Sequence, residues 1–140
     1  MTKKDISKLE ESINVKFSDR SILKVAVTHR SYINEHRSSG LSHNERLEFL
    51  GDAVLELAVT DFLFRQYPDR NEGELTALRA ALVNTNTLSA ASGKLAINDF
   101  LLLSKGEAKD TGRARQYILA NTFEAVVGAI YLDQGYEKAN

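Results

Sequence analysis

Hydrophobic positions recur along this chain with the helical period, and six or so helices are predicted. The expected segments, by residue number, are 5–13, a helix capped by Ser18 around 22–27, 44–66, a helix capped by Asp69 or Asn71 around 75–83, 88–95 and 113–132. Polar stretches that contain glycine, residues 34–42 and 104–112, are expected to be loops. Eight glycines and one proline are few turn formers for an all-β protein. The pattern therefore predicts an all-α domain.

The most apolar of these helices has recognisable end signals. Ser42 and Glu45 have the spacing of a capping box, with serine at N-cap and glutamate at N3. Pro68 is expected to stop this helix, and Gly135 to end the last one. Residues 136–140 are expected to begin a helix that continues beyond the given sequence.

Four acids of segment 44–66 share one face of the predicted helix. At about 100° per residue, Glu48, Asp52 and Glu56 fall within about 60° of Glu45 on a helical wheel. The remaining positions are almost all apolar: Phe49, Leu55 and Val59 beside the acids, and Leu47, Leu50, Val54, Leu57 and Ala58 opposite them.

Apolar flanks on every side make this acid stripe unusual. A helix that is apolar nearly all round is expected to be buried. Carboxylates in a row within it repel one another and lose hydration, so they need cations or protons. A hard divalent ion with oxygen ligands meets that need. Plainer interpretations stay open: Glu45 serves the capping box, Glu56 is solvated, and the stripe is an ordinary wet face.

Segment 118–132 is a second nearly apolar helix that contains two possible ligands. Asn121 and Glu124 are i, i+3 neighbours on one face. Gly128 and Ala129 would allow another helix to approach closely. Packing of the two apolar helices would bring together Glu48, Asp52, Asn121 and Glu124. A buried hydrogen-bonded pair of Asn121 and Glu124, without a metal, is the alternative.

The composition excludes several kinds of functional site and argues against others. The chain has no cysteine, which excludes thiolate metal sites and cysteine nucleophiles and fits a reducing cytosol. No apolar run is long enough to span a bilayer, and residues 1–5 lack the apolar segment of a signal peptide. A net charge of −1 is unusual for a dedicated nucleic-acid binder. Any RNA contact is expected from local basic patches, bound cations or a further module.

Four motifs resemble those of the ribonuclease III family, in the family's order. Residues 44–52, NERLEFLGD, match its signature without a gap. The other three are THRSY at 28–32, EGELTALR at 72–79, and ILANTFEA at 118–125 followed by GAIYLD at 128–133. The resemblance covers nearly the whole chain and implies that residues 1–140 are a ribonuclease III catalytic (endonuclease) domain, all-helical and dimeric.

The resemblance also implies a metal-dependent nuclease. Glu48, Asp52 and Glu124 match metal ligands of the family, and Asp52 and Glu124 are the expected catalytic pair. Asn121 stands where many members carry aspartate; it keeps one carbonyl oxygen for a metal but loses the charge. Mg²⁺ is the expected cofactor, with Mn²⁺ as a possible substitute.

Other residues receive roles from the same resemblance. Glu45 and Glu72 match accessory acids, which are expected to hold water molecules near the metals. Phe49 matches a position that plugs a pocket of the partner in a symmetric homodimer, where two active sites share one valley. The alternative is that Phe49 fills its own core.

Double-stranded RNA is the implied substrate, cut to 5′-phosphate and 3′-hydroxyl ends with short 3′ overhangs during rRNA or mRNA processing in the cytoplasm. Candidate RNA contacts, in segments that solvation alone also explains, are His29, Arg30, Asn44, Lys105, Lys109, Arg113 and Arg115. Little base specificity is expected, because A-form RNA is recognised mostly by shape. The C-terminal double-stranded-RNA-binding domain of typical bacterial members is not in this sequence, so weak, salt-dependent RNA binding is expected.

Three other interpretations stay open. Asn121 suits a catalytically weak or silent relative that only binds RNA or ribosomes. A helical interaction domain would use the acids for structural cations alone. The compact branch of the family that naturally lacks the RNA-binding domain is the third, although residues 44–52 look more like the standard bacterial type.

Overall fold

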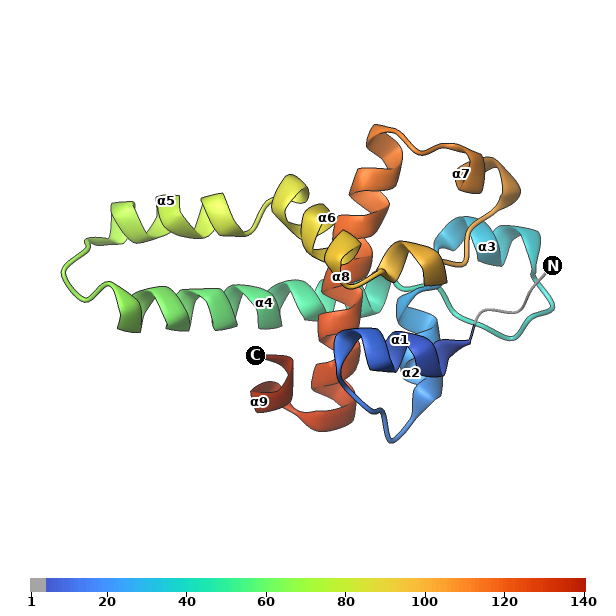
Figure 1. Ribbon diagram of the computed structural model, residues 1–140, viewed down its shortest axis with the longest axis horizontal. Helices are drawn as coiled ribbons and strands as arrows, with labels where there is room; N and C mark the ends of the chain where they lie inside the picture. Colours follow the sequence, from blue (N-terminus) through green and yellow to red (C-terminus); the bar gives the residue numbers. More distant parts are fainter. Residues whose placement is uncertain (1–4) are drawn as a thin grey trace.

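The computed structural model describes residues 5–140, which are almost entirely helical (Figure 1). In chain order the helices are α1 (Ile6–Ile13), α2 (Arg20–Ala26), α3 (Arg30–Glu35), α4 (Glu45–Gln66), α5 (Glu72–Leu82), α6 (Thr85–Lys94), the 3₁₀ helix η1 (Ile97–Phe100), α7 (Lys105–Lys109), α8 (Arg113–Gln134) and α9 (Tyr136–Ala139). Within the described range, the β pairing is confined to one bridge between Thr28 and Leu102. The predicted all-α class is confirmed. Residues 1–4, part of the stretch without a signal-peptide segment, lie outside the described residues.

Side-chain caps explain where most of these helices begin. The capping residues are Asp5 for α1, Asp19 for α2, His29 for α3, Asn71 for α5, Asn84 for α6 and Ser104 for α7. The prediction for Asn71 is confirmed, because its Oδ1 accepts the Glu74 backbone N–H at 2.9 Å. The prediction for Ser18 is wrong by one residue, because Asp19 Oδ1 accepts the Ser21 backbone N–H at 3.0 Å. The Ser18 backbone N–H donates to Asp133.

The start of α4 differs from the predicted capping box. Asn44, not Ser42, is the N-cap residue, and its side chain makes no capping bond. Its Nδ2 donates to the carbonyl oxygen of Ala26 at 2.8 Å, and its backbone N–H donates to that of Thr28 at 3.0 Å. The Glu45 carboxylate binds Arg30 instead of reaching back to the helix start. Tertiary contacts to α2 thus replace the local cap.

One of the two predicted polar loops contains a short helix, since α7 lies within 104–112. The stretch 34–42 is non-helical from residue 36 on, as predicted, and only the end of α3 reaches into it. The two helices are tied together, because the backbone N–H of Ser104 donates to Ser31 Oγ at 2.9 Å. The backbone N–H of Lys105 donates to the carboxylate of Glu35 at 3.2 Å. Contacts between distant segments order what the local composition predicted as loop.

α8 runs through the centre of the molecule, against α2, α4, α6 and α9 (Figure 1). The hydrophobic core lies around it and includes Leu9, Leu23, Val27, Ile97 and Ala129, each of them fully or almost fully buried. Beyond the core, α4 and α5 extend as an antiparallel helical hairpin. No helix of residues 5–140 combines the length and the apolar character needed to cross a membrane.

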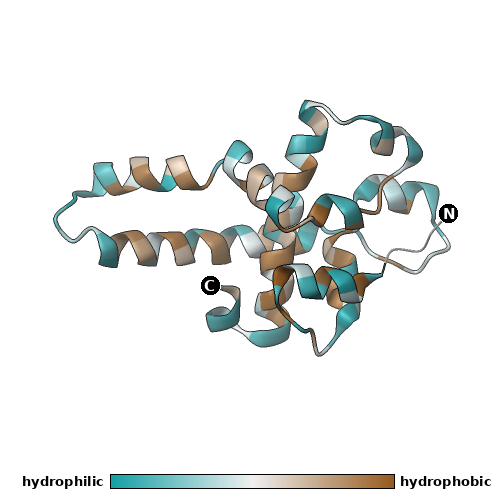
Figure 2. Ribbon diagram, viewed as in Figure 1, coloured by the Kyte–Doolittle hydropathy of each residue, from teal (hydrophilic) through white to brown (hydrophobic). Residues whose placement is uncertain are grey.

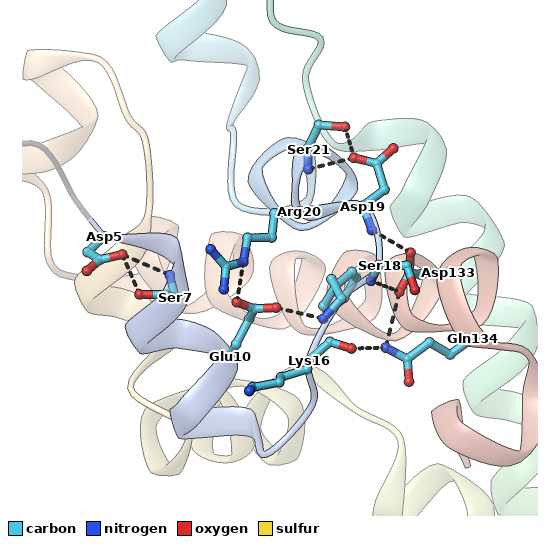
Figure 3. A network of polar contacts seen from close by, with 11 residues as sticks. Asp5, Ser7, Glu10, Lys16, Ser18, Asp19, Arg20, Ser21, Asp133 and Gln134 are labelled. Atoms are coloured by element: carbon cyan, nitrogen blue, oxygen red, sulfur yellow. Dashed lines mark hydrogen bonds and ion pairs between the residues drawn. The ribbon is translucent and has the colours of Figure 1, made fainter.

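A polar network holds the N-terminal helices to the end of α8 (Figure 3). The Asp133 carboxylate accepts the backbone N–H groups of Ser18 and Asp19 at 2.8 and 3.0 Å. Buried Glu10 accepts the Phe17 backbone N–H at 2.6 Å and pairs with the Arg20 guanidinium at 2.7 Å. These contacts fix the turn before α2 against both α1 and α8.

The expected burial of α4 on all sides is wrong. Phe49 is 84% exposed and Phe64 69% exposed, and Leu57, predicted to face the core, is also exposed. Apolar residues continue along α4 and α5 well outside the body of the domain (Figure 2). One apolar side of α4 packs inside this chain. Another apolar side is left uncovered by residues 5–140.

Candidate functional site

Two glycines bring α4 and α8 into backbone contact. A Cβ atom on Gly51 would lie 1.6 Å from the carbonyl oxygen of Glu124, and one on Gly128 would lie 2.4 Å from that of Leu47. Neither distance is physically possible, so only glycine permits this crossing. The close approach expected at Gly128 is present. It places the acid stripe of α4 directly beside Glu124.

An open cavity of about 530 Å³ lies at this crossing. We call it the carboxylate cavity; its lining residues are Glu45, Glu48, Phe49, Asp52, Asn121 and Glu124. The four residues expected to converge therefore do share one cavity. Three are carboxylates and one is a carboxamide, so the donor set consists entirely of oxygen donors suited to a hard cation.

Glu124 is the least accessible acid of this group, with 8% of its surface exposed. Burial, a hydrogen bond with Asp52, and the negative charges of Asp52, Glu48 and Glu56 raise the pKa of Glu124 to about 8. Near neutral pH, Glu124 is therefore mostly protonated in the metal-free protein and hydrogen-bonded to Asp52. A bound cation would take the place of that proton.

The pKa of Glu48 is shifted in the same direction. Burial, followed by the charges of Glu45 and Asp52, raises the pKa of its carboxyl group. As the side chains stand, residues 5–140 contain no group of three or more acidic or histidine side chains gathered closely enough to hold a metal ion.

A smaller cavity of about 60 Å³ adjoins the carboxylate cavity. We call it the rear cavity; it is lined by His29, Arg30, Asn44, Glu45, Glu48, Ile118, Asn121 and Thr122. Glu45, Glu48 and Asn121 line both cavities.

His29 and Arg30, predicted RNA contacts, have partners within the chain. His29 Nδ1 accepts the Ser31 backbone N–H at 3.1 Å, so the proton of the neutral ring is on Nε2. Burial lowers the pKa of His29, which favours this neutral form. Arg30 Nη2 lies 3.0 Å from a Glu45 oxygen, in a solvent-exposed ion pair. Both side chains still border the rear cavity, as does Asn44.

The other predicted residues lie away from the two cavities. Lys105 and Lys109 are exposed on α7, and Arg113 is exposed at the start of α8. Arg115 has a structural role, because its guanidinium donates to Asn98 Oδ1 at 2.8 Å and to the carbonyl oxygens of Glu107 and Ala108. Glu72 is the first residue of α5, at the tip of the hairpin, and lines neither cavity.

Two residues of this region were not predicted from the sequence. Gly51 stands inside a strongly apolar helix, and a glycine in that position is a signal of close backbone approach. Thr122 lies between the two expected ligands on α8 and is completely buried. No local pattern in the sequence distinguishes it from an ordinary helical threonine.

Comparisons with known proteins agree with the motifs. The Ribonuclease-III-like family model matches residues 19–140. Ribonuclease 3 of Oceanobacillus iheyensis is 53% identical over 133 residues, which cover 95% of this chain and 58% of that protein. Ribonuclease 3 of Carboxydothermus hydrogenoformans is 49% identical over 139 residues, which cover 99% of this chain and 59% of that protein.

Solved structures show the same fold. A structure of the nuclease domain of ribonuclease III from Campylobacter jejuni matches with a TM-score of 0.87 at 41% identity, over 96% of this chain and 90% of that one. It is described as showing structural flexibility in its region involved in dimer formation. This chain spans less than two thirds of the length of the curated relatives that it matches. By motifs, fold and similarity alike, the chain belongs to the ribonuclease III family.

Proposed function

We propose that this domain is the endonuclease part of a ribonuclease III and hydrolyses phosphodiester bonds of double-stranded RNA. Mg²⁺ is the proposed cofactor, with Mn²⁺ as a substitute, and the proposed products carry 5′-phosphate and 3′-hydroxyl ends. The proposed setting is rRNA or mRNA processing in the cytoplasm. The observation that carries this proposal is the convergence of Glu48, Asp52, Asn121 and Glu124 in one open cavity.

The electrostatics of the cavity support a role for a cation. A bound divalent ion supplies a water nucleophile near neutral pH and neutralises charge on the phosphate and the leaving oxygen. Glu48, Asp52, Glu124 and the carbonyl oxygen of Asn121 are the proposed ligands. Glu124 would lose its proton on holding such an ion, and Glu45 would hold water at the rim of the cavity. Glu72, at the hairpin tip, has no proposed role within its own subunit.

A homodimer is the proposed assembly. The exposed face of α4 includes Phe49, Leu57 and Phe64, three large apolar side chains in contact with solvent. Such a face on a domain of this kind marks an interaction surface. Phe49 also lines the carboxylate cavity, so a partner seated on it would border the site. The description of the Campylobacter jejuni relative, which mentions a dimer-forming region, supports this assembly.

Lys105, Lys109 and Arg113 are the proposed phosphate contacts, together with His29 and Arg30 beside the rear cavity. The first three are exposed and basic, and the chain as a whole carries a net charge of −1. RNA binding by so few cations is expected to be weak and to fall steeply with salt.

Cleavage of a perfect RNA duplex by the 140-residue chain tests the proposal. We expect products with Mg²⁺ or Mn²⁺ at low salt, and none with Ca²⁺ or EDTA. Glu124→Gln should lower the cleavage rate at least ~100-fold, because it removes a negative ligand from the cavity. Glu137→Gln, at an exposed acid on α9, is the matched control and should cleave like the wild type. Absence of product at high enzyme concentration with Mg²⁺ would reject the nuclease proposal.

A catalytically silent RNA-binding module is the second candidate, and the neutral Asn121 favours it. The same assay separates the two, because a silent module binds duplex RNA without cutting it. Retained wild-type cleavage by Glu124→Gln would instead remove Glu124 from the proposed ligand set.

A further inference from the structure

Thr122, one of the residues that line the rear cavity, carries an unexplained hydroxyl group. Thr122 has 0% of its surface exposed, and its Oγ1 is buried without a hydrogen-bond partner among the described residues. A helical threonine ordinarily donates to the carbonyl oxygen four residues earlier, here that of Ile118. Thr122 does not, although both residues line the rear cavity. A buried hydroxyl without a partner is costly and is usually satisfied by protein or ordered water.

The size and chemistry of the rear cavity suit water. A volume of about 60 Å³ has room for a small group of ordered molecules. The residues that line it carry both donors and acceptors: the amides of Asn44 and Asn121, the Thr122 hydroxyl, the Arg30 guanidinium and the Glu48 carboxylate. Water both donates and accepts, so it can satisfy such a set, whereas a cation would face the guanidinium.

We propose that the rear cavity is a bound-water site, and that Thr122 acts through this water as a positioning residue for Asn121 and Glu48. Asn121 and Glu48 line both the rear cavity and the carboxylate cavity. Water on the rear side holds the Asn121 amide group, which leaves its carbonyl oxygen for the carboxylate cavity. The role matters more here than with an aspartate at position 121, because an amide must be oriented whereas a carboxylate presents oxygen either way round. This inference rests on the proposed metal-dependent function.

The matched variants Thr122→Val and Thr122→Ser test this role in the 140-residue chain. Valine keeps the shape and removes the hydroxyl, whereas serine keeps the hydroxyl. Calorimetric titration with Mn²⁺ should show about 10-fold weaker binding for Thr122→Val and near wild-type binding for Thr122→Ser. Thr76→Val, at an exposed position of α5, is the control for the substitution itself. Melting curves in EDTA check that each variant is folded.

Two outcomes would overturn the inference: wild-type Mn²⁺ affinity in Thr122→Val, or an equal loss in both Thr122 variants, which would indicate packing alone. A wild-type chain that binds no Mn²⁺ would reject the proposed function instead. A metal-free crystal structure of the wild type decides the matter independently, even if Thr122→Val does not fold. Ordered water bonded to Thr122 Oγ1 supports the proposal, and a dry cavity or a direct protein partner for that atom rejects it.

Discussion

α4 and α8 are the same length, 22 residues, and both are mostly apolar, yet far more of α8 is buried. Every residue of α8 from Glu124 to Ile130 is buried. In α4, by contrast, Phe49 and Phe64 are the most exposed large apolar side chains of the described residues. Two similar sequence patterns have thus led to a central core helix and to a protruding one.

The neighbours of each helix explain this difference. α8 packs against α2, α4, α6 and α9, which cover it on several sides. Beyond its crossing with α8, α4 has only α5 as an extensive neighbour among the described residues. Apolar content therefore shows that a helix needs covering, but it does not show whether the cover comes from the same chain or from a partner. The candidate site lies where the two kinds of helix cross.

The largest expected effect comes from breaking that crossing. Gly51→Ala places a methyl group where the backbone of Glu124 lies, and backbone cannot move aside as a side chain can. We expect the free energy of unfolding to fall by at least about 3 kcal/mol, measured by urea denaturation. Gly93→Ala is the control, because nothing lies within 4 Å of its Cβ position, and it should be neutral or stabilising. Equal stability of the two variants would contradict the close contact.

Truncation on each helix separates core from interface. Ile130→Ala on α8 should lower the free energy of unfolding by about 3 kcal/mol, because it leaves a cavity in the core.

Phe49→Ala on α4 should change monomer stability by less than about 0.5 kcal/mol, because the ring is 84% exposed. It should weaken the dimer by about 2 kcal/mol, or ~30-fold, in analytical ultracentrifugation. An unchanged dimer would remove Phe49 from the interface.

The pH dependence of stability tests the buried acid at the crossing. The pKa of Glu124 rises from 4.5 to about 8 on folding, so the folded state binds this proton more tightly than the unfolded state. The resulting stabilisation is fully present below pH 4.5 and is lost as pH rises to about 8. Melting temperatures in EDTA should therefore fall over that range. Glu124→Gln should lack this component, and identical pH profiles for both proteins would refute the raised pKa.

The smallest expected effect comes from restoring a charge on α8. Asn121→Asp adds a fourth carboxylate to the carboxylate cavity's expected ligands, so it should preserve or modestly raise Mg²⁺-dependent cleavage. Without metal it should lower the melting temperature slightly, since it adds repulsion beside Glu48 and Asp52. A sharp loss of cleavage would mean that the amide group of Asn121 has a role that a carboxylate cannot fill.

Much of the site was predictable from local spacing. The helical wheel grouped Glu48 with Asp52, and the i, i+3 spacing grouped Asn121 with Glu124. The cap at Asn71 and the end of α8 at Gly135, with φ of 90°, also follow from residue type. The ligand roles, the metal and the RNA contacts stay predictions.

Other features depended on contacts between distant segments. The capping box predicted at Ser42 is absent because Asn44 begins the helix instead. Asn44 is hydrogen-bonded to the carbonyl oxygens of Ala26 and Thr28, which belong to an earlier part of the chain. Arg115 has the charge of an RNA contact, but it holds α7 and Asn98 in place. Such competition between local and tertiary partners has no signal in a short window of sequence.

The sequence by itself determined the helical class, the two apolar helices and the acids that they carry, because periodicity and side-chain chemistry are local properties. Only the tertiary structure decided that Gly51 meets the backbone of α8 and that burial beside Asp52 raises the pKa of Glu124. It also decided that, among the described residues, Thr122 Oγ1 is buried without a partner and one face of α4 is left open. The physical reason is that burial, close approach and shifted pKa values depend on which segments become neighbours, and neighbours are set by the packing of the whole chain.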